Sequence, residues 1–365
     1  MVTLAIYTYE KAVILKNILE NEGIGVVVEN VNRQQPLISS GVRVCVNVAD
    51  LPKALSVIDN CVSFKKVANR SGSGKSKIVL VPVDFSEYSI KACEVGFLYA
   101  YKKNYQVVIL HSYIGRDYSG SLPLGNLIKD KKISEYFRKK EERAKKLMFD
   151  FEQQIHSHIE SGELPDVICK FEIMEGIPES AILEYSKNSN PALIVMGTRG
   201  THKKEQDLIG SVTAEVLDSS KYPMYVIPED IAVANLGHIK HVVFYCNLEQ
   251  QDLLSLDVFV REFENSDAEI SLVHVPEKKE KMVSERMDEM LKYCTNQYNG
   301  TAFKSKIFDE NTFLTDFDNF LRDNSVEIVV IPNKRRNIFA RLFSPSLAHR
   351  ILFHTDIPML VVPIK

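Results

Sequence analysis

An apolar run that ends in glycine lies just past the middle of the chain, within residues 193–213 (LIVMGTRGTHKKEQDLIGSVT). Four consecutive apolar residues are typical of a strand covered on both faces of a sheet, so Gly197 falls where the chain leaves that sheet. A polar loop follows, and a helix is expected to begin near Ser211. Because α/β sheets bind ligands at the carboxyl ends of their strands, this segment predicts an α/β domain with a ligand site beside Gly197.

Three glycines in this segment share the spacing Gly-x2-Gly-x9-Gly and are followed by serine, at Gly197, Gly200, Gly210 and Ser211. Because glycine has no Cβ, the backbone can turn sharply and bring its N–H groups against an anion. The free N–H groups and the positive dipole end of the following helix favour the same anion. Each such contact contributes about 0.3–1 kcal/mol, so several must act together on a phosphate. Turn glycines without a ligand are the alternative interpretation.

A carboxylate follows another predicted strand, residues 77–83 (KIVLVPV). Asp84 would lie at the carboxyl end of that strand, where it can accept hydrogen bonds from a sugar hydroxyl or an adenine amino group. The alternative is that Asp84 only caps the helix expected over 89–102, for which Ser86 is a second candidate cap. The sequence alone leaves both interpretations open.

Strand and helix patterns alternate through the rest of this region and indicate a doubly wound parallel sheet. The further strands are expected at 105–111, 167–174, 193–196 and 223–228, and the helices at 131–161, 178–189 and 211–219. Residues 238–365 repeat the same plan. Their strands are expected at 241–246, 268–275, 302–308, 326–331 and 358–363, and their helices near 252–264, 277–297, 313–323 and 345–353.

The first 68 residues follow the order strand, helix, strand, strand, helix, which suggests a small ferredoxin-like α+β domain. Its strands are expected at 3–8, 25–30 and 42–48, and its helices at 11–22 and 51–60. This domain resembles a small bacterial signal-transducing domain. Residues 69–76 (NRSGSGKS) have the composition of a linker. Their Gly-Lys-Ser ending is not a P-loop, because it precedes a strand where a P-loop follows one.

Two motifs far apart in the sequence resemble the universal stress protein family. The segment 81–86 (VPVDFS) is similar to the V-P-V-D-x-S opening of that family, and its ATP-binding members carry the glycine spacing described above after their fourth strand. The resemblance implies two tandem, Rossmann-like domains of the adenine nucleotide alpha hydrolase type. It also implies nucleotide contacts at Pro82, Asp84, Ser112, Met196, Gly197, Gly200, Gly210, Ser211, Val212 and Thr213.

One position departs from that family pattern. Members usually have valine after the histidine that ends the second strand, and the backbone of that valine meets the adenine edge. Here Ser112 follows His111. A main-chain contact tolerates serine, but the apolar packing against the adenine ring is lost. His111 itself is interpreted as a packed residue at the strand end.

The second copy has lost the matching ligand positions. Pro82 and Asp84 of the first copy correspond to Tyr245 and Asn247 in the second. The three glycines, Gly197, Gly200 and Gly210, correspond to Pro332, Arg335 and Pro345. Proline has no N–H to offer a phosphate, and side chains fill the approach that the glycines leave open. The second copy is therefore expected to be degenerate.

The composition narrows the class of protein further. A net charge of -3 argues against a general nucleic-acid binder. No basic-then-apolar leader or long apolar run is found, which favours a cytoplasmic protein that does not contact a membrane. Six cysteines are scattered singly without a C-x2-C pair, so buried free thiols are expected instead of a metal site.

The sequence thus predicts a cytoplasmic protein of stress response or signalling, with an N-terminal domain (1–68), a linker (69–76), a nucleotide-binding domain (77–230) and a degenerate second domain (238–365). ATP is the expected ligand, with ADP and AMP as alternatives and Mg²⁺ left open. The two repeats are expected to pair through their fifth strands, and a homodimer is a further expectation. No catalytic set is recognised. The alternatives are a scaffold that binds no nucleotide and a slow ATPase.

Overall fold

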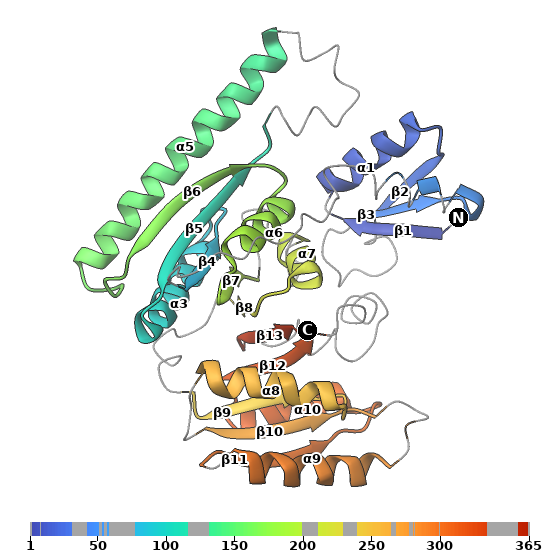
Figure 1. The fold of residues 1–365 in the computed structure, drawn as a ribbon, viewed down its shortest axis with the longest axis vertical. Coiled ribbons are helices and arrows are strands. Elements are labelled where there is room, and N and C mark those ends of the chain that lie inside the picture. The colour runs from blue at the N-terminus through green and yellow to red at the C-terminus, as the bar shows by residue number, and fades with distance from the viewer. Residues whose placement is uncertain are drawn as a thin grey trace.

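The described residues form two β-sheets, one of three strands and one of ten (Figure 1). The structure is a computed structural model. Most of the residues that it describes lie in helices or strands. The residues that it describes are 2–7, 9–30, 42–50, 53–54, 57, 77–115, 131–198, 211–228, 239–263, 268–276, 280, 282–298, 300–333 and 357–363.

The three-stranded sheet is formed by the N-terminal segment. Its elements are β1 (Val2–Tyr7), α1 (Tyr9–Asn21), β2 (Val26–Asn30), β3 (Val42–Val46) and the short 3-10 turn η2 (Val48–Asp50). β3 lies between β1 and β2 and is antiparallel to both, which is the arrangement of a split β-α-β unit. Its core residues are Ala12, Leu15, Leu19, Ile24, Val26, Val44, Val46 and Ala54. Most of the helix expected at 51–60 lies outside the described residues.

The ten-stranded sheet begins after residue 77, and its first half alternates strands and helices as the sequence predicts. The elements are β4 (Ile78–Pro82), α3 (Glu87–Lys103), β5 (Gln106–Tyr113), α5 (Lys131–Glu160), β6 (Cys169–Glu175), α6 (Pro178–Ser189), β7 (Leu193–Gly197), α7 (Ser211–Ser219) and β8 (Met224–Ile227). Their strand order in the sheet is β6-β5-β4-β7-β8.

The second half of the sheet has the same strand order, β11-β10-β9-β12-β13. Its elements are β9 (His241–Tyr245), α8 (Gln250–Phe263), β10 (Glu269–His274), α9 (Val283–Gln297), β11 (Ala302–Ile307), α10 (Phe313–Asp323), β12 (Ile328–Asn333) and β13 (Met359–Pro363). The helix expected at 345–353 lies outside the described residues. Neighbouring strands run parallel within each half, so the expected α/β class is confirmed.

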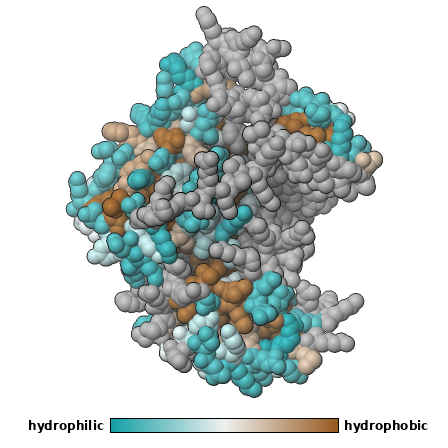
Figure 2. Space-filling view, in the orientation of Figure 1, coloured by the Kyte–Doolittle hydropathy of each residue, from teal (hydrophilic) through white to brown (hydrophobic). Residues whose placement is uncertain are grey.

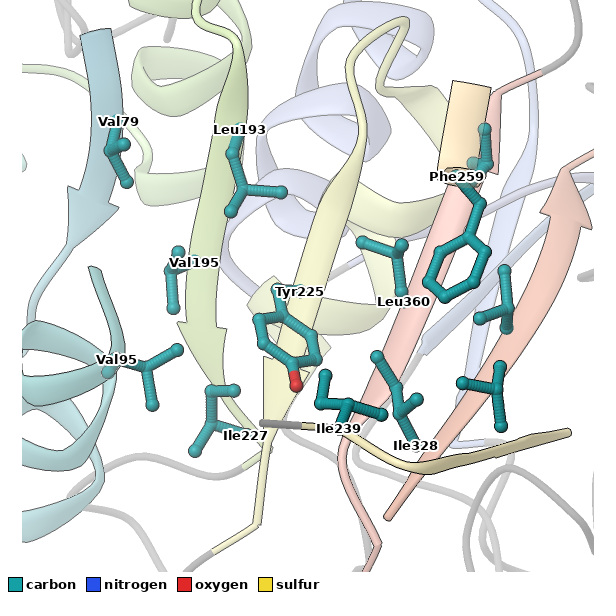
Figure 3. Close-up of a cluster of buried hydrophobic side chains, with 14 of the residues drawn as sticks. Val79, Val95, Leu193, Val195, Tyr225, Ile227, Ile239, Phe259, Ile328 and Leu360 are labelled. Carbon is teal, nitrogen blue, oxygen red and sulfur yellow. The ribbon is translucent and has the colours of Figure 1, made fainter. Parts of the chain in front are cut away.

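The two halves meet where β8 pairs with β13, and this pair is antiparallel. The strand residues here are apolar and buried on both faces, which explains why these strands read as continuous apolar runs. Figure 3 shows the resulting core, in which side chains from both halves, among them Leu193, Tyr225, Phe259, Ile328 and Leu360, lie in one continuous layer.

The helices present one apolar face to the sheet. In α9 the buried residues Met287, Met290 and Cys294 recur at a spacing of three to four, and most of the exposed residues of the helix are polar. The lower end of the molecule in Figure 2, where Figure 1 places α9, is accordingly mostly hydrophilic. The exposed face of α5 carries i,i+4 ion pairs such as Arg138–Glu142 and Lys145–Glu141.

Candidate functional site

The order of the strands places a topological switch point between β4 and β7. From β4 the chain moves outward to β5 and β6, and it then returns to the other side of β4 to form β7 and β8. The two strands are in parallel register, with Val79 opposite Leu193 and Leu80 opposite Ile194. Their carboxyl ends therefore lie side by side. Open α/β sheets bind ligands at this kind of position, because the connecting segments diverge there and leave the strand ends accessible.

Asp84 follows β4 at this edge, and the first turn of α3 holds its carboxylate. Its Oδ1 accepts hydrogen bonds from Ser86 N (3.1 Å), Ser86 Oγ (2.6 Å) and Ser89 Oγ (2.8 Å). In return, the Asp84 N–H donates to Ser89 Oγ at 2.9 Å. Ser86 is the N-cap residue of α3, as the sequence predicts, so Asp84 is not needed for that role. The carboxylate is fixed in place at the end of the strand.

His111 and Phe85 pack beside this turn. The Nδ1 atom of His111 lies 2.8 Å from the carbonyl oxygen of Val83, and its ring centroid lies 4.4 Å from that of Phe85. Because a carbonyl only accepts, Nδ1 carries the proton. Burial lowers the pKa of His111 below its ordinary value, against the opposing effects of the Val83 carbonyl and the Asp84 charge. His111 is thus a packed histidine at the strand end, as the sequence analysis interprets it.

Gly197 at the end of β7 is required by packing as well as by its place in the motif. A Cβ on this residue would lie 2.6 Å from the Cβ of Tyr88 and 3.2 Å from the Tyr88 carbonyl oxygen. Tyr88 is in the first turn of α3 and is buried. The glycine therefore allows the start of α3 to approach the end of β7. This approach brings the Asp84 turn close to the glycine segment that begins at Gly197.

The start of α7 is tied to the same strand end. Thr213 is buried, and its hydroxyl donates to the Gly197 carbonyl oxygen at 2.9 Å. This hydroxyl is therefore used in a structural bond. Ser211 is the first residue of α7, so the N-terminal turn of that helix begins beside Gly197. Val212 is partly buried against the apolar core.

The remaining expected contact residues lie on neighbouring strands. Pro82 ends β4 and is in register with Leu110 of β5. Ser112 lies near the end of β5 and is partly exposed, and Met196 in β7 is buried. Gly200 and Gly210 lie outside the described residues. The structure thus brings together Asp84, Gly197, Ser211 and Thr213 at adjoining strand ends, with Ser112 one strand away from β4.

The second half repeats the framework of the site. The Nδ1 of His274 lies 2.8 Å from the Cys246 carbonyl oxygen, and in both halves the histidine follows its carbonyl partner by 28 residues. Leu248 has a positive φ of 57°, matching the 65° of Phe85. The Asn247 N–H donates to Asp252 Oδ2 at 2.7 Å, as the Asp84 N–H donates to Ser89. The backbone geometry is conserved between the halves, whereas the side chains differ.

Sequence reasoning missed three residues that shape the site: Phe85, Tyr88 and Ser89. Ser89 had a readable signal, because serine in the first turn of a helix commonly bonds to backbone and side-chain groups nearby. The positive φ of Phe85 and the contact of Tyr88 with Gly197 have no local signal, since both depend on where α3 meets the sheet.

Within the described ranges, no group of three or more His, Cys, Asp or Glu residues is placed to hold a metal ion. No helix in the part of the chain that the structure describes is long and apolar enough to cross a membrane.

Comparison with known proteins gives three related findings. Residues 75–228 match the Universal stress protein family. Two universal stress proteins of Methanocaldococcus jannaschii are similar in sequence: one is 26% identical over 167 residues, covering 43% of this chain and 85% of the relative. The other is 29% identical over 157 residues, covering 41% of this chain and 94% of the relative.

The likeness in fold extends beyond that segment. The crystal structure of a universal stress protein from Archaeoglobus fulgidus DSM 4304 is similar with a TM-score of 0.56 and 20% sequence identity. The similarity covers 80% of this chain and 97% of the Archaeoglobus fulgidus chain. At this identity the likeness concerns the fold alone.

Proposed function

We propose that the universal stress protein domain at residues 75–228 binds an adenine nucleotide, and that the chain acts in stress response or signalling. ATP is the expected ligand, and ADP and AMP are the alternatives. The expected location in the cytoplasm belongs to the same proposal.

One observation supports this function above others: Asp84 follows β4 and Gly197 ends the adjacent parallel strand β7, at the point where the strand order reverses. Their loops are held together by the contact between Tyr88 and Gly197 and by the bond from Thr213 to Gly197. A carboxylate and a helix N-terminus therefore face the same edge of the sheet. A carboxylate can bind ribose hydroxyls or the adenine amino group, and a helix N-terminus can bind phosphate.

In this arrangement each group would have a distinct role. Asp84 would accept hydrogen bonds from the nucleoside, because its Oδ1 is already positioned by Ser86 and Ser89. The backbone from Gly197 through Gly200, and the N–H groups at Gly210 and Ser211, would bind the phosphates. Thr213 would contribute indirectly, since its bond to the Gly197 carbonyl anchors the first turn of α7 beneath the phosphates.

The second half of the ten-stranded sheet would be a tandem partner that binds no nucleotide. It has the same strand order and the same histidine contact, but Asn247 replaces the carboxylate. Pro332, near the end of β12, takes the place of Gly197 and has no N–H. The antiparallel pairing of β8 with β13 supports an intramolecular pair of domains, because it covers two strand edges that would otherwise be open.

Small molecules released from the freshly purified protein test this function directly. We expect mass spectrometry to find ATP, ADP or AMP at close to one molecule per chain. Protein that is free of nucleotide, and that also fails to bind added ATP in titration calorimetry, would contradict the proposal and favour the scaffold alternative.

A pair of variants tests the position of the site. Gly210→Asp puts a carboxylate where the phosphates are expected, so ATP binding should be lost while the fold, followed by circular dichroism, is retained. The matched control is Pro345→Asp at the corresponding place in the second copy, which should bind ATP as the unmodified protein does. Equal loss in both variants would contradict a site in the first copy alone.

The slow ATPase alternative is distinguished by turnover. Hydrolysis that depends on bound ATP should disappear in the Gly210→Asp variant, whereas a contaminating activity should not. The hydroxyls of Ser86 and Ser89 are engaged in capping α3 and in holding the Asp84 carboxylate, so binding without efficient turnover is the expected result.

A further inference from the structure

A partly buried network of charged side chains lies at the carboxyl ends of β9 and β10 in the second half. The Nε2 atom of His274 lies 3.0 Å from Glu280 Oε2, and the other oxygen of Glu280 accepts from Arg286 Nη1 at 2.8 Å. The second nitrogen of Arg286, Nη2, donates to the carbonyl oxygen of Leu248 at 2.5 Å. The network therefore joins β10, Glu280 in the segment between β10 and α9, α9 itself and the turn after β9.

The partners of His274 fix the number of protons in this network. Its Nδ1 lies 2.8 Å from the Cys246 carbonyl oxygen, and its Nε2 faces a carboxylate oxygen. Both partners are acceptors, whereas a neutral imidazole carries a proton on only one nitrogen. The geometry therefore requires one proton more than a neutral histidine and an ionised Glu280 supply together.

The surrounding charges place that proton on His274. Arg286 donates to Glu280 at 2.8 Å, and a guanidinium at this distance favours the ionised carboxylate. From α8, burial raises the pKa of the Asp252 carboxyl group to about 6, against a smaller opposing effect of His274. The residue after β9, Cys246, contributes its carbonyl and its buried thiol, and the neighbour on β11 is the apolar Ile307. His274 is then an imidazolium paired with the Glu280 carboxylate.

The first half provides an internal comparison, because His111 makes the same bond with its Nδ1. The distance to the Val83 carbonyl oxygen is again 2.8 Å, but the ring of His111 packs against Phe85 instead of an Arg-paired carboxylate. Burial lowers the pKa of His111, which favours the neutral form. The same backbone framework thus holds a neutral histidine in one half and a charged one in the other.

We propose that protonated His274, Glu280 and Arg286 form a proton-dependent latch that holds the start of α9 over the carboxyl edge of the second half. When His274 loses its second proton, the Nε2 lone pair and the Glu280 carboxylate face each other as two acceptors. The bond between His274 and Glu280 is lost, whereas Arg286 keeps its bonds to Glu280 and to the Leu248 carbonyl. The start of α9 is then attached to this edge through Arg286 alone and opens more readily.

The protonation state is tested by nuclear magnetic resonance on protein with ¹⁵N-labelled histidine. At pH 6 we expect His274 to show N–H protons on both ring nitrogens and His111 to show one, in the same spectrum. Substituting Glu280→Gln supplies an amide N–H to Nε2, so His274 should change to a single N–H without loss of the fold. A singly protonated His274 in the unmodified protein would overturn the proposal.

The release of α9 is tested by hydrogen exchange at pH 6 and pH 9, corrected for the intrinsic rate. Because a hydrogen bond between charged groups is lost, we expect opening at the start of α9 to increase roughly tenfold or more at the higher pH. The Glu280→Gln variant should show no such increase, and helix α5 serves as the reference in both proteins. Equal behaviour of α9 in the two proteins would contradict a latch.

Discussion

Tyr225 of β8 lies directly opposite Leu360 of β13, at the centre of the antiparallel pair that joins the two halves of the ten-stranded sheet. Both side chains are buried, and Figure 3 shows the phenol ring of Tyr225 lying beside Ile239, in the layer that also holds Leu360. Burial, together with the charge of Glu327, raises the pKa of Tyr225 far above its ordinary value, so the phenol is neutral. The two halves therefore share one core at this point.

Removing the Tyr225 ring should destabilise both halves together. Tyr225→Ala deletes a large buried aromatic side chain and leaves a cavity between the halves, so we expect a loss of about 3–5 kcal/mol in the free energy of unfolding. Denaturation followed by far-ultraviolet circular dichroism measures the change. Tyr101→Ala is the control, because Tyr101 is 62% exposed, and its effect should stay within about 0.5 kcal/mol. Equal effects would show that the junction is not a shared core.

Gly197 should not tolerate a methyl group. In a Gly197→Ala variant the new Cβ would lie 2.6 Å from the Cβ of Tyr88, so α3 or the end of β7 must move. We expect a loss of about 1–3 kcal/mol in the free energy of unfolding, measured by denaturant titration. Gly25→Ala is the matched control, because no atom lies within 4 Å of its added Cβ. A neutral result at Gly197 would mean that the contact relaxes at no cost.

Replacing the Asp84 carboxylate should weaken nucleotide binding while preserving its turn. The side-chain oxygen of Asp84→Asn can still accept from Ser86 and Ser89. The lost charge removes a strong acceptor for the nucleoside, so we expect an affinity for ATP that is roughly 10- to 100-fold lower by calorimetry. Asn247→Asp, the converse change in the second half, should create no new site. Unchanged binding in Asp84→Asn would exclude this carboxylate from the contact.

Asp252 should make stability depend on pH. Its side chain is fully buried, and burial raises its pKa from 3.8 to about 6, although Oδ2 accepts hydrogen bonds from the N–H groups of Asn247 and Glu249. Between these two values the folded protein binds the proton more tightly than the unfolded chain does. The free energy of unfolding therefore falls as the pH rises from about 4 to 6 and stays lower above that range.

The substitution Asp252→Asn isolates this effect, because its side-chain oxygen can accept the same two bonds without a titrating group. Relative to the unmodified protein, the variant should gain up to about 3 kcal/mol of stability between pH 4 and pH 7. Denaturant titrations of both proteins at the two pH values measure the difference. A difference in stability that does not change with pH would mean that Asp252 titrates alike in the folded and unfolded states.

Local sequence patterns were sufficient for most secondary structure. Helix α10 begins and ends at Phe313 and Asp323, as its periodicity predicts, and α6 matches its predicted range of 178–189. The strands agree within a few residues, because buried apolar runs and flanking turn residues are properties of short segments. The position of Asp84 and Gly197 at strand ends was predictable for the same reason.

The structural roles of individual residues were harder to predict from the sequence. The sequence interpretation assigned Gly197 to close approach by an anion, whereas the structure shows that it also admits Tyr88. Thr213 was expected at the nucleotide, and its hydroxyl is directed to the Gly197 carbonyl. Such contacts join segments far apart in the chain, and periodicity carries no information about which segments meet.

Residue patterns along the chain were enough to predict the order of strands and helices, the internal repeat and the glycine spacing, since each can be recognised without knowing which segments meet. Three-dimensional packing was needed to show that β4 lies between β5 and β7, that Tyr225 meets Leu360, and that His274 faces Glu280 while His111 faces Phe85. The physical reason is that burial patterns specify which face of an element is covered, whereas the covering partner is chosen by packing and hydrogen bonding across the whole sheet.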